Sequence, residues 1–309
     1  MPFSLNRRQF ALGTSSLALG FAMGMPARAQ STSKSVTTVL GTYEIPTDPQ
    51  RVVAIDHRTD LEPALVLGLP VIASGYWADR PWVPAPAGMT DLDMPTTAEH
   101  VLSLDPDLII CSADEPDDEW WPANQLLSIA PVLPTSFKTN WRNNLLDLGK
   151  LVGREAPAAA AIAEYDALIA DIRARHAEVL AGKIIAAVQY FAEDKTFRVH
   201  LPNQDGYNNP KGEAITELGI TTLDPASLGE YGMVAYESLT DALGAVDGIL
   251  FANSGTGALA SLAEDTFWQR LPAVANGKVL EMNGNTNFGS FYTARHVATA
   301  FDELLKLLA

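Results

Sequence analysis

Residues 156–181 read APAAAAIAEYDALIADIRARHAEVLA, the one long segment whose composition and spacing predict an α-helix throughout. Alanine, leucine, glutamate and arginine dominate this stretch, and these residues favour helix. Pro157 suits the first turn, and Gly182 suits the position just past the last turn. Apolar residues recur at steps of three and four, which predicts one buried stripe along a rod of roughly 39 Å at ~1.5 Å per residue.

This helix separates two parts of the chain that have similar lengths and their own strand and helix signals. We interpret it as a strut between two lobes: residues 36–153 form the N-terminal lobe, residues 154–182 the linker helix, and residues 183–309 the C-terminal lobe. The alternative is an ordinary core helix within one large domain. With 309 residues, 47% of them hydrophobic and 19% charged, the chain is long enough for two cores.

The charge balance limits the possible partners. The formal net charge is −16 at pH 7. A chain this acidic lacks the basic footprint that phosphate contacts need, so we expect no nucleic-acid partner. It is also not expected to bind an anionic membrane surface through charge alone.

Residues 1–29 have the pattern of an export signal and are left out of the fold prediction. Asn6-Arg7-Arg8-Gln9-Phe10 is a twin-arginine pattern, an apolar run follows it, and Ala27-Arg28-Ala29 offers small residues to a signal peptidase. We therefore expect a periplasmic protein. Cys111 is the single cysteine, which excludes a disulfide within the chain, and its apolar neighbours predict a small core residue.

Strand and helix signals alternate in both halves, which predicts parallel sheets with right-handed crossovers. In the first half the expected strands are residues 51–55, 70–73, 108–110 and 130–133, and the expected helices are residues 61–67, 96–102 and 140–152. In the second half the expected strands are residues 183–190, 248–252 and 278–282, and the expected helices are residues 211–218, 238–243, 266–271 and 291–308. Residues 191–210 are expected to form a long loop. The predicted fold class is α/β, with two parallel-sheet, Rossmann-like lobes joined by one long helix.

In such sheets, ligands bind beyond the carboxyl ends of the strands. The loops at these ends are rich in aromatic and arginine residues, and five of the six tryptophans lie in the first half. The first-lobe candidates for ligand binding are Arg58, Tyr76, Trp77, Arg80, and Trp141 or Arg142. The second-lobe candidates are Tyr207, Asn253, and Phe288 or Tyr292. Aromatic faces combined with arginine forks suit a bulky anionic ligand.

Five segments, in their sequence and in their order along the chain, resemble segments of one protein family. They are residues 51–55, LVLGLPVI at 65–72, AEHVLSLDPDLII at 98–110, ESLTDALGAVDGILF at 237–251 and WQRLPAVANGKVLEM at 268–282. Together they cover most of residues 50–309. The family is the periplasmic iron–siderophore and vitamin B12 binding proteins of ABC importers, whose lobes are joined by a single helix.

The resemblance implies capture of a ferric siderophore between two lobes with little hinge motion, and delivery to an ABC permease in the inner membrane. It implies a monomer that has no cofactor, metal site or catalytic residue of its own, because the iron stays with the siderophore. Family members present one acidic residue from each lobe to arginines of the permease. The first-lobe position matches Glu99; in the second lobe Thr240 stands there, so the adjacent Asp241 is the candidate.

Haem and cobalamin are alternative ligands within this family, and a free metal ion is a further alternative. A metal-ion receptor would need three or four converging ligands, for which His57, His200 and carboxylates are candidates. An enzyme is not expected, because the five histidines are scattered and no nucleophile-elbow signature is present.

Overall fold

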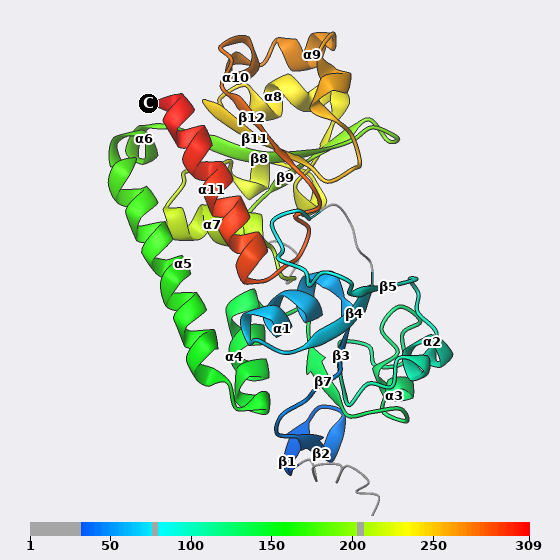
Figure 1. Ribbon diagram of the computed structural model, residues 1–309. Helices are drawn as coiled ribbons and strands as arrows, with labels where there is room; N and C mark the ends of the chain where they lie inside the picture. Colours follow the sequence, from blue (N-terminus) through cyan, green and yellow to red (C-terminus); the bar gives the residue numbers. More distant parts are fainter. Residues whose placement is uncertain (1–31, 76–79, 203–206) are drawn as a thin grey trace, which may run out of the picture. The chain divides into compact units, whose positions relative to one another are not determined.

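The computed structural model describes residues 32–75, 80–202 and 207–309. Residues 32–309 form one compact unit that contains two five-stranded sheets (Figure 1). The expected signal peptide, residues 1–29, lies outside the described residues. Within the described ranges, no helix is both long and apolar enough to cross a membrane.

The first sheet is parallel throughout, with the strand order β5-β4-β3-β6-β7. Its strands are β3 (Val52–Asp56), β4 (Val71–Gly75), β5 (Thr90–Leu92), β6 (Leu108–Ser112) and β7 (Val132–Thr135). β3 and β6 are buried on both faces, which explains their unbroken apolar sequences. The strand order reverses between β3 and β6, so the carboxyl ends of these two strands form a switch point where ligands commonly bind.

The remaining elements of the first lobe flank this sheet. They are the hairpin β1 (Ser33–Thr38) and β2 (Gly41–Pro46), the π-helical turn η1 (His57–Leu61), and the helices α1 (Glu62–Val66), α2 (Ala98–Ser103), α3 (Ala123–Leu126) and α4 (Trp141–Val152). The turn η1 begins directly after β3, where the Asp56 carboxylate accepts hydrogen bonds from the amides of Arg58 and Thr59. This cap fixes the direction in which the chain leaves the sheet.

The second sheet is mixed, with the strand order β10-β9-β8-β11-β12. Its strands are β8 (Ile185–Phe191), β9 (Thr196–His200), β10 (Met233–Ala235), β11 (Gly248–Asn253) and β12 (Val279–Asn283). β8, β11 and β12 are parallel, whereas β9 and β10 run antiparallel to their neighbours. The expected loop over residues 191–210 is therefore wrong for residues 196–200, which form a hairpin with β8.

Helices and short turns complete the second lobe. The helices are α7 (Pro210–Leu218), α8 (Leu239–Leu243), α9 (Thr266–Gln269), α10 (Pro272–Ala275) and α11 (Phe291–Leu308), and the 3-10 turns are η2 (Pro225–Ser227), η3 (Glu230–Gly232), η4 (Tyr236–Ser238) and η5 (Leu259–Leu262). The closing helix α11 packs on β11 and β12 and also reaches α1 of the first lobe. It therefore provides a second connection between the lobes, beside the linker helix.

The long helix of the sequence prediction is α5 (Glu155–Arg175), followed by α6 (Ala177–Gly182). His176 interrupts it with φ −116° and ψ 23°, and its Nε2 lies 2.8 Å from Oδ1 of Asp302 on α11. α5 packs against α1 and α4 of the first lobe and against α7 and α11 of the second. The expected α/β class, with two sheet-containing lobes joined by a long helix, is confirmed.

One apolar core continues from sheet to sheet through this helical layer. Val52 and Ile110 of the first sheet and Ala187 and Leu250 of the second belong to the same buried cluster. At its centre the Trp141 ring lies 5.2 Å from the ring of Tyr165 on α5 and 6.3 Å from that of Phe291 on α11. The sequence placed Trp141 in the binding site, but this fully buried ring is a core residue.

The Trp141→Ala substitution is expected to destabilise the protein by about 3–5 kcal/mol, because it opens a cavity where three helices meet. Urea unfolding followed by circular dichroism measures the effect. Leu146→Ala is the matched control on the same helix, since Leu146 is 40% exposed; its effect should stay within about 0.5 kcal/mol. Equal losses in the two variants would contradict the central role of Trp141.

Candidate functional site

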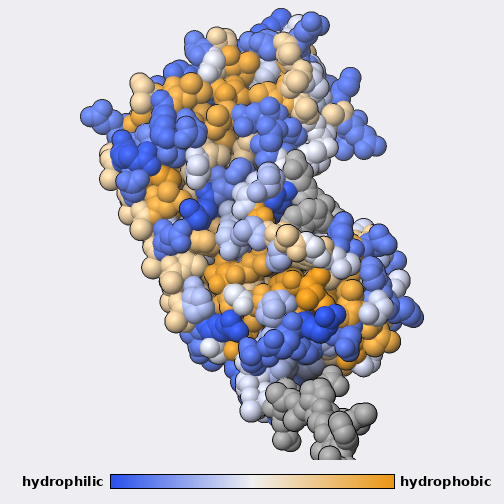
Figure 2. Space-filling model, viewed as in Figure 1, coloured by the Kyte–Doolittle hydropathy of each residue, from blue (hydrophilic) through white to orange (hydrophobic). Residues whose placement is uncertain are grey.

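Two adjoining cavities lie where the lobes meet. The second-lobe cavity has a volume of about 500 Å³ and is lined by Phe191, Arg198, His200, Tyr207, Asn208, Asn209, Lys211, Tyr231, Met233, Asn287 and Phe288. The first-lobe cavity has a volume of about 230 Å³ and is lined by Arg58, Ser112, Asp114, Glu115, Asp118, Trp121, Phe137, Lys138, Tyr207 and Phe288. Tyr207 and Phe288 line both, so the cavities are two parts of one cleft. The surface is hollowed between the lobes, on the side away from α5 (Figure 2).

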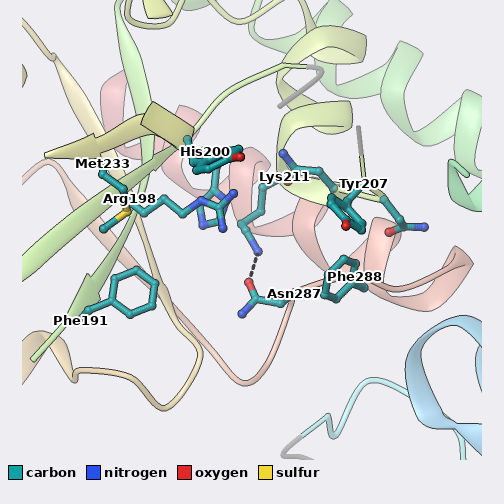
Figure 3. A pocket seen from close by; sticks show the side chains of 11 residues that line it. Phe191, Arg198, His200, Tyr207, Lys211, Met233, Asn287 and Phe288 are labelled. Atoms are coloured by element: carbon teal, nitrogen blue, oxygen red, sulfur yellow. Dashed lines mark hydrogen bonds between the residues drawn. The ribbon is translucent and has the colours of Figure 1, made fainter. Parts of the chain in front are cut away.

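Three nitrogen-bearing side chains form one wall of the second-lobe cavity (Figure 3). Arg198 and His200 stand two residues apart on β9, so they share a face of the strand while Phe197 and Val199 enter the core. Lys211 comes from the first turn of α7, whose start is capped by Asn209. The hairpin that the sequence prediction missed is therefore the element that builds this wall.

Lys211 is almost completely buried and meets neutral acceptors. Its Nζ donates to the carbonyl oxygen of Thr286 at 3.0 Å, to Oγ1 of the same residue at 3.2 Å, and to Oδ1 of Asn287 at 3.2 Å. No carboxylate of the described residues pairs with it. Burial, together with the charges of Arg198 and Arg80, holds the pKa of Lys211 well below its ordinary value. An anion in the cavity would stabilise the protonated amine.

His200 is the second buried nitrogen base of this wall. Only 3% of its surface is exposed, and its Nε2 has no hydrogen-bond partner among the described residues. Burial, with the charges of Lys211 and Arg198, lowers the pKa of His200 well below 6.5, so the ring is neutral. A hydroxyl or protonated oxygen of a ligand could donate to this nitrogen.

Arg58 lines the first-lobe cavity, and the carboxylate of Asp56 holds its side chain. Its Nε and Nη2 donate to Asp56, the latter at 2.8 Å, and its guanidinium lies 5.0 Å from the Phe137 ring centroid and 5.1 Å from that of Phe288. Burial would raise the pKa of Asp56, but the charge and hydrogen bonds of Arg58 lower it to about 2. The guanidinium therefore sits between two rings from opposite lobes.

The first-lobe cavity has an acidic edge. Asp114, Glu115 and Asp118 line it together with Trp121 and Phe137. The Asp114 carboxylate accepts from Oγ of Ser136 at 2.6 Å and from the amide of Phe137 at 2.7 Å, which fixes the loop after β7. The two cavities thus differ in charge: the first has an acidic edge, and the second has a basic wall.

The structure brings together three of the residues that the sequence placed in the site, namely Arg58, Tyr207 and Phe288. Tyr76 and Trp77 lie outside the described residues. Glu99 on α2 and Asp241 on α8, the expected docking residues, are both exposed. Arg198 and Lys211 were not predicted, and His200 was named only as a candidate ligand of a free metal ion. The alternation of TFRVH at 196–200 is the signal that could have indicated a strand with Arg198 and His200 on one face.

The other predicted site residues line neither cavity. Arg80 is 2% exposed and forms an ion pair with Glu62 at 2.7 Å, so its guanidinium is occupied within the protein. Arg142 pairs with Glu217 and Asp166, each at 2.8 Å, and Trp141 beside it is a core residue. These burials and pairings correct the expectation that the three side chains face a ligand.

Two further candidates from the second lobe also have partners elsewhere. Asn253 Nδ2 donates to Glu281 at 3.0 Å and to Asn283 at 2.9 Å, across the ends of β11 and β12. Tyr292 is half-buried, and its ring packs on that of Phe291 at 5.3 Å. Asn253 is the last residue of β11 and Tyr292 lies in the first turn of α11, so their side chains serve the sheet and the start of that helix.

A free metal ion finds no ready set of ligands here. Among the residues that the structure describes, no group of three or more histidine, cysteine, aspartate or glutamate side chains could hold one. His57 is buried, with Nδ1 3.3 Å from the Gly75 carbonyl oxygen, and burial lowers its pKa to about 3. The free cysteine, Cys111, is buried in β6, as expected.

A long helix between two α/β lobes and a basic, aromatic cleft at their junction define a solute-binding protein of the transport type. A sequence profile described as periplasmic binding protein matches residues 78–286, and the chain belongs to this family. The expected membership in its iron–siderophore and vitamin B12 type is confirmed. Proteins of this family carry a ligand for transport; they are not enzymes and use no cofactor.

Individual relatives agree with this assignment. The ferric enterobactin-binding periplasmic protein FepB of Escherichia coli is 27% identical over 290 residues, 85% of this chain and 88% of the relative. A periplasmic solute-binding protein of Mycobacterium smegmatis has a TM-score of 0.73 at 20% identity, covering 90% of this chain and 99% of that one. FhuD2 of Staphylococcus aureus with bound ferrioxamine B has a TM-score of 0.68 at 18% identity, covering 84% and 99%. At these low identities, the two structures support the fold alone.

Asp60 belongs to the same turn as Arg58, and its unusual pKa makes a testable prediction about protein stability. It is fully buried, and it accepts from the amide of Asp56 at 2.9 Å and from the hydroxyl of Thr135. Burial and the nearby charge of Asp56 raise the pKa of Asp60 to about 8. In the unfolded chain the carboxyl titrates near ~3.9. Between these values only the folded protein keeps the proton, so Asp60 makes stability fall as pH rises.

The Asp60→Asn variant is expected to lack this pH dependence. From about pH 4 to about pH 8 the parent should lose up to about 1.4 kcal/mol per pH unit more than the variant. Urea midpoints measured across this range provide the comparison, and Asp194→Asn in the exposed β8–β9 turn is the control that should follow the parent. If the Asp60→Asn curve also followed the parent, Asp60 would be ionised in the folded protein.

Proposed function

We propose that the protein captures a ferric siderophore in the cleft between its lobes and delivers it to an ABC permease. The observation that carries this proposal is the buried Lys211 amine, which faces the second-lobe cavity beside Arg198 and His200. Among the residues that the structure describes, its hydrogen-bond acceptors are all neutral. The named ligands of two relatives support it: FepB is a ferric enterobactin-binding protein, and the FhuD2 structure contains ferrioxamine B.

The cleft suits a bulky chelate that is rich in oxygen. Arg198 and Lys211 can donate to catecholate, hydroxamate or carboxylate oxygens, and hydrogen bonds between ionised groups are the stronger kind. Phe191, Tyr207 and Phe288 offer ring faces to the apolar parts of the chelate. A negatively charged chelate offsets the cost of a protonated Lys211, so anionic chelates should bind better than neutral ones. The iron keeps the oxygen ligands of the chelate.

The proposal includes a place and a partner. The twin-arginine signal at residues 1–29 would export the chain, and the protein would work as a monomer in the periplasm. Glu99 and Asp241 are exposed on helices of different lobes, and they would meet basic residues of the permease in the inner membrane. Haem and cobalamin are the alternative ligands.

Lys211→Met is expected to weaken binding of an anionic ferric tris-catecholate by about tenfold to a thousandfold, at ~1.4 kcal/mol per decade. Methionine has a similar length and tolerates burial. Tryptophan fluorescence quenching of the purified protein measures binding against a panel of ferric tris-catecholate, ferric trihydroxamate, haem and cobalamin. The matched control is Lys183→Met, whose lysine pairs with Asp247 at the amino end of the second sheet.

Two outcomes of this titration would count against the proposal. Haem or cobalamin binding more tightly than every ferric chelate would assign the cleft to that alternative. A folded Lys211→Met protein with the parent's affinity for the ferric tris-catecholate would place the binding site elsewhere.

Glu99→Ala is expected to slow uptake of the ferric chelate while the purified variant keeps the parent's affinity. The reason is that the exposed Glu99 lies on α2, outside both cavities. Uptake is measured with radioactive iron in cells whose only copy of the protein is the variant. Asp241→Ala tests the second lobe in the same way, and Glu178→Ala, an exposed glutamate of α6, is the control. Reduced affinity of the purified Glu99 variant would contradict a docking role.

A further inference from the structure

The loop between β12 and α11, residues 284–290, has an unusual backbone. Phe288 has φ 58°, in the left-handed region. This backbone conformation costs a non-glycine residue about 1–2 kcal/mol. Gly284 and Gly289 on either side have φ 94° and 148°. Phe288 and its neighbour Asn287 both line the second-lobe cavity. A strained residue at a cleft persists only when its surroundings hold it in place.

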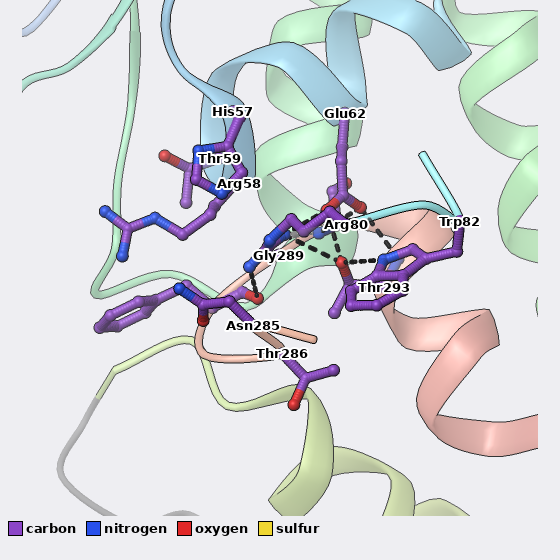
Figure 4. Close-up of polar contacts among 12 residues, drawn as sticks. His57, Arg58, Thr59, Glu62, Arg80, Trp82, Asn285, Thr286, Gly289 and Thr293 are labelled. Carbon is purple, nitrogen blue, oxygen red and sulfur yellow. Dashed lines mark hydrogen bonds and ion pairs between the residues drawn. The ribbon is translucent and has the colours of Figure 1, made fainter. Parts of the chain in front are cut away.

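Arg80 of the first lobe binds backbone carbonyl groups of this loop (Figure 4). Its Nη2 donates to the carbonyl oxygens of Asn287 at 2.9 Å and Phe288 at 3.0 Å. Its Nη1 donates to Glu62 at 2.7 Å and to the Thr293 hydroxyl at 3.0 Å. The guanidinium thus makes four hydrogen bonds with geometry that a lysine ammonium cannot reproduce.

Glu62 fixes the same loop at its other end. Its Oε2 accepts from the amides of Ser290 at 2.9 Å and Thr293 at 3.0 Å, at the start of α11. α11 has no side-chain cap of its own, so a carboxylate from the first lobe takes that role. Both Glu62 and Arg80 have side chains that are 0% exposed.

The position of the loop also sets the position of Lys211. Both acceptor residues of its amine, Thr286 and Asn287, belong to residues 284–290. On the other side, the Arg58 guanidinium packs against the Phe288 ring. The loop therefore carries one aromatic wall of the cleft and orients the buried amine of Lys211.

We propose that Glu62 and Arg80 are a positioning pair for the binding site: they hold the strained 284–290 loop so that Phe288, Asn287 and Lys211 keep their places around the cavity. The pair acts through the loop and does not touch the bound chelate. For its effect on binding, the inference rests on the function proposed above. For its effect on the loop, it rests on the contacts of Arg80 and Glu62 alone.

The first measurement needs no bound chelate. Hydrogen–deuterium exchange of the full chain is compared for the parent, Glu62→Gln/Arg80→Met and Arg80→Lys. Removing both charges together avoids leaving one buried and unpaired. We expect faster exchange at the amides of residues 285–290 and 293 in the double variant, with a smaller increase in Arg80→Lys, which keeps the ion pair and should fold in any case.

A matched control distinguishes the effect of losing the Glu62–Arg80 pair from the effect of losing any buried or partly buried arginine. Arg154 also binds two backbone carbonyl oxygens, those of Leu67 and Gly68, each at 3.1 Å. Arg154→Met should leave exchange at residues 285–290 unchanged. If Arg80→Lys and the double variant also left it unchanged, the proposal would be overturned.

The second measurement is a double-mutant cycle on the affinity for ferric tris-catecholate. Glu62→Gln/Arg80→Met should weaken binding at least tenfold in the parent background. In an Asn287→Ala/Phe288→Ala background, the same change should weaken it less than threefold further, because two of the three side chains that the pair positions are gone. Fully additive losses would mean that the pair acts on the chelate directly, and unchanged affinity of the folded variant would mean a purely structural role. Either result overturns the proposal.

Failure of the proposed function gives a different pattern. In that case the parent itself does not bind the ferric tris-catecholate, whereas the exchange measurement still decides whether Glu62 and Arg80 hold the loop.

Discussion

The contact on which the arrangement of the lobes depends is the buried ion pair between Glu62 and Arg80. Burying two charges is costly, and an ion pair offsets that cost only when the remaining hydrogen-bonding positions are also filled. Here α11 and the loop before it fill both Nη atoms of Arg80 and the Glu62 carboxylate, through Thr293, the Ser290 amide and the carbonyl groups of residues 287–288. Nε of Arg80 has no partner among the described residues. The pair is satisfied only when α1, the chain at residue 80 and the start of α11 meet. It therefore favours one relative placement of first lobe and closing helix.

The same logic explains why the two lobes contribute differently to the cleft. In the first lobe, Arg58 and Arg80 are neutralised by Asp56 and Glu62, so their charges are used inside the protein. Their role is to shape the cleft: one packs between two aromatic rings, and the other holds a strained loop. In the second lobe, Lys211 meets only neutral acceptors among the described residues. In the proposed function, recognition of an anion would therefore fall mainly to the second lobe, although arginines are more frequent in the loops of the first.

The sequence predicted the elements better than the directions of their side chains. Continuous apolar strands such as residues 51–55 and the alanine-rich α5 have local signals, because burial on both faces and helix propensity depend on neighbouring residues. The position after a strand also suggested Arg58, which lines the first-lobe cavity. The same rule was wrong for Arg80. The direction of that side chain is set by Glu62 and the carbonyl groups of residues 287–288, which are far away in the sequence. Such tertiary partners cannot be read from one chain without its fold.

The mixed second sheet explains how a protein with a negative net charge could bind the anionic ligand that we propose. The net charge is −16, yet charges farther than about 8 Å are largely screened at physiological ionic strength. What counts is the local wall, and the antiparallel strand β9 puts Arg198 and His200 on one face, next to Lys211. A long loop, as the sequence predicted for residues 191–210, would not impose that two-residue spacing. The acidic edge of the first-lobe cavity, with Asp114 and Asp118, disfavours an anion there. In the proposed function, the two cavities would together orient a chelate with its most negative part toward β9.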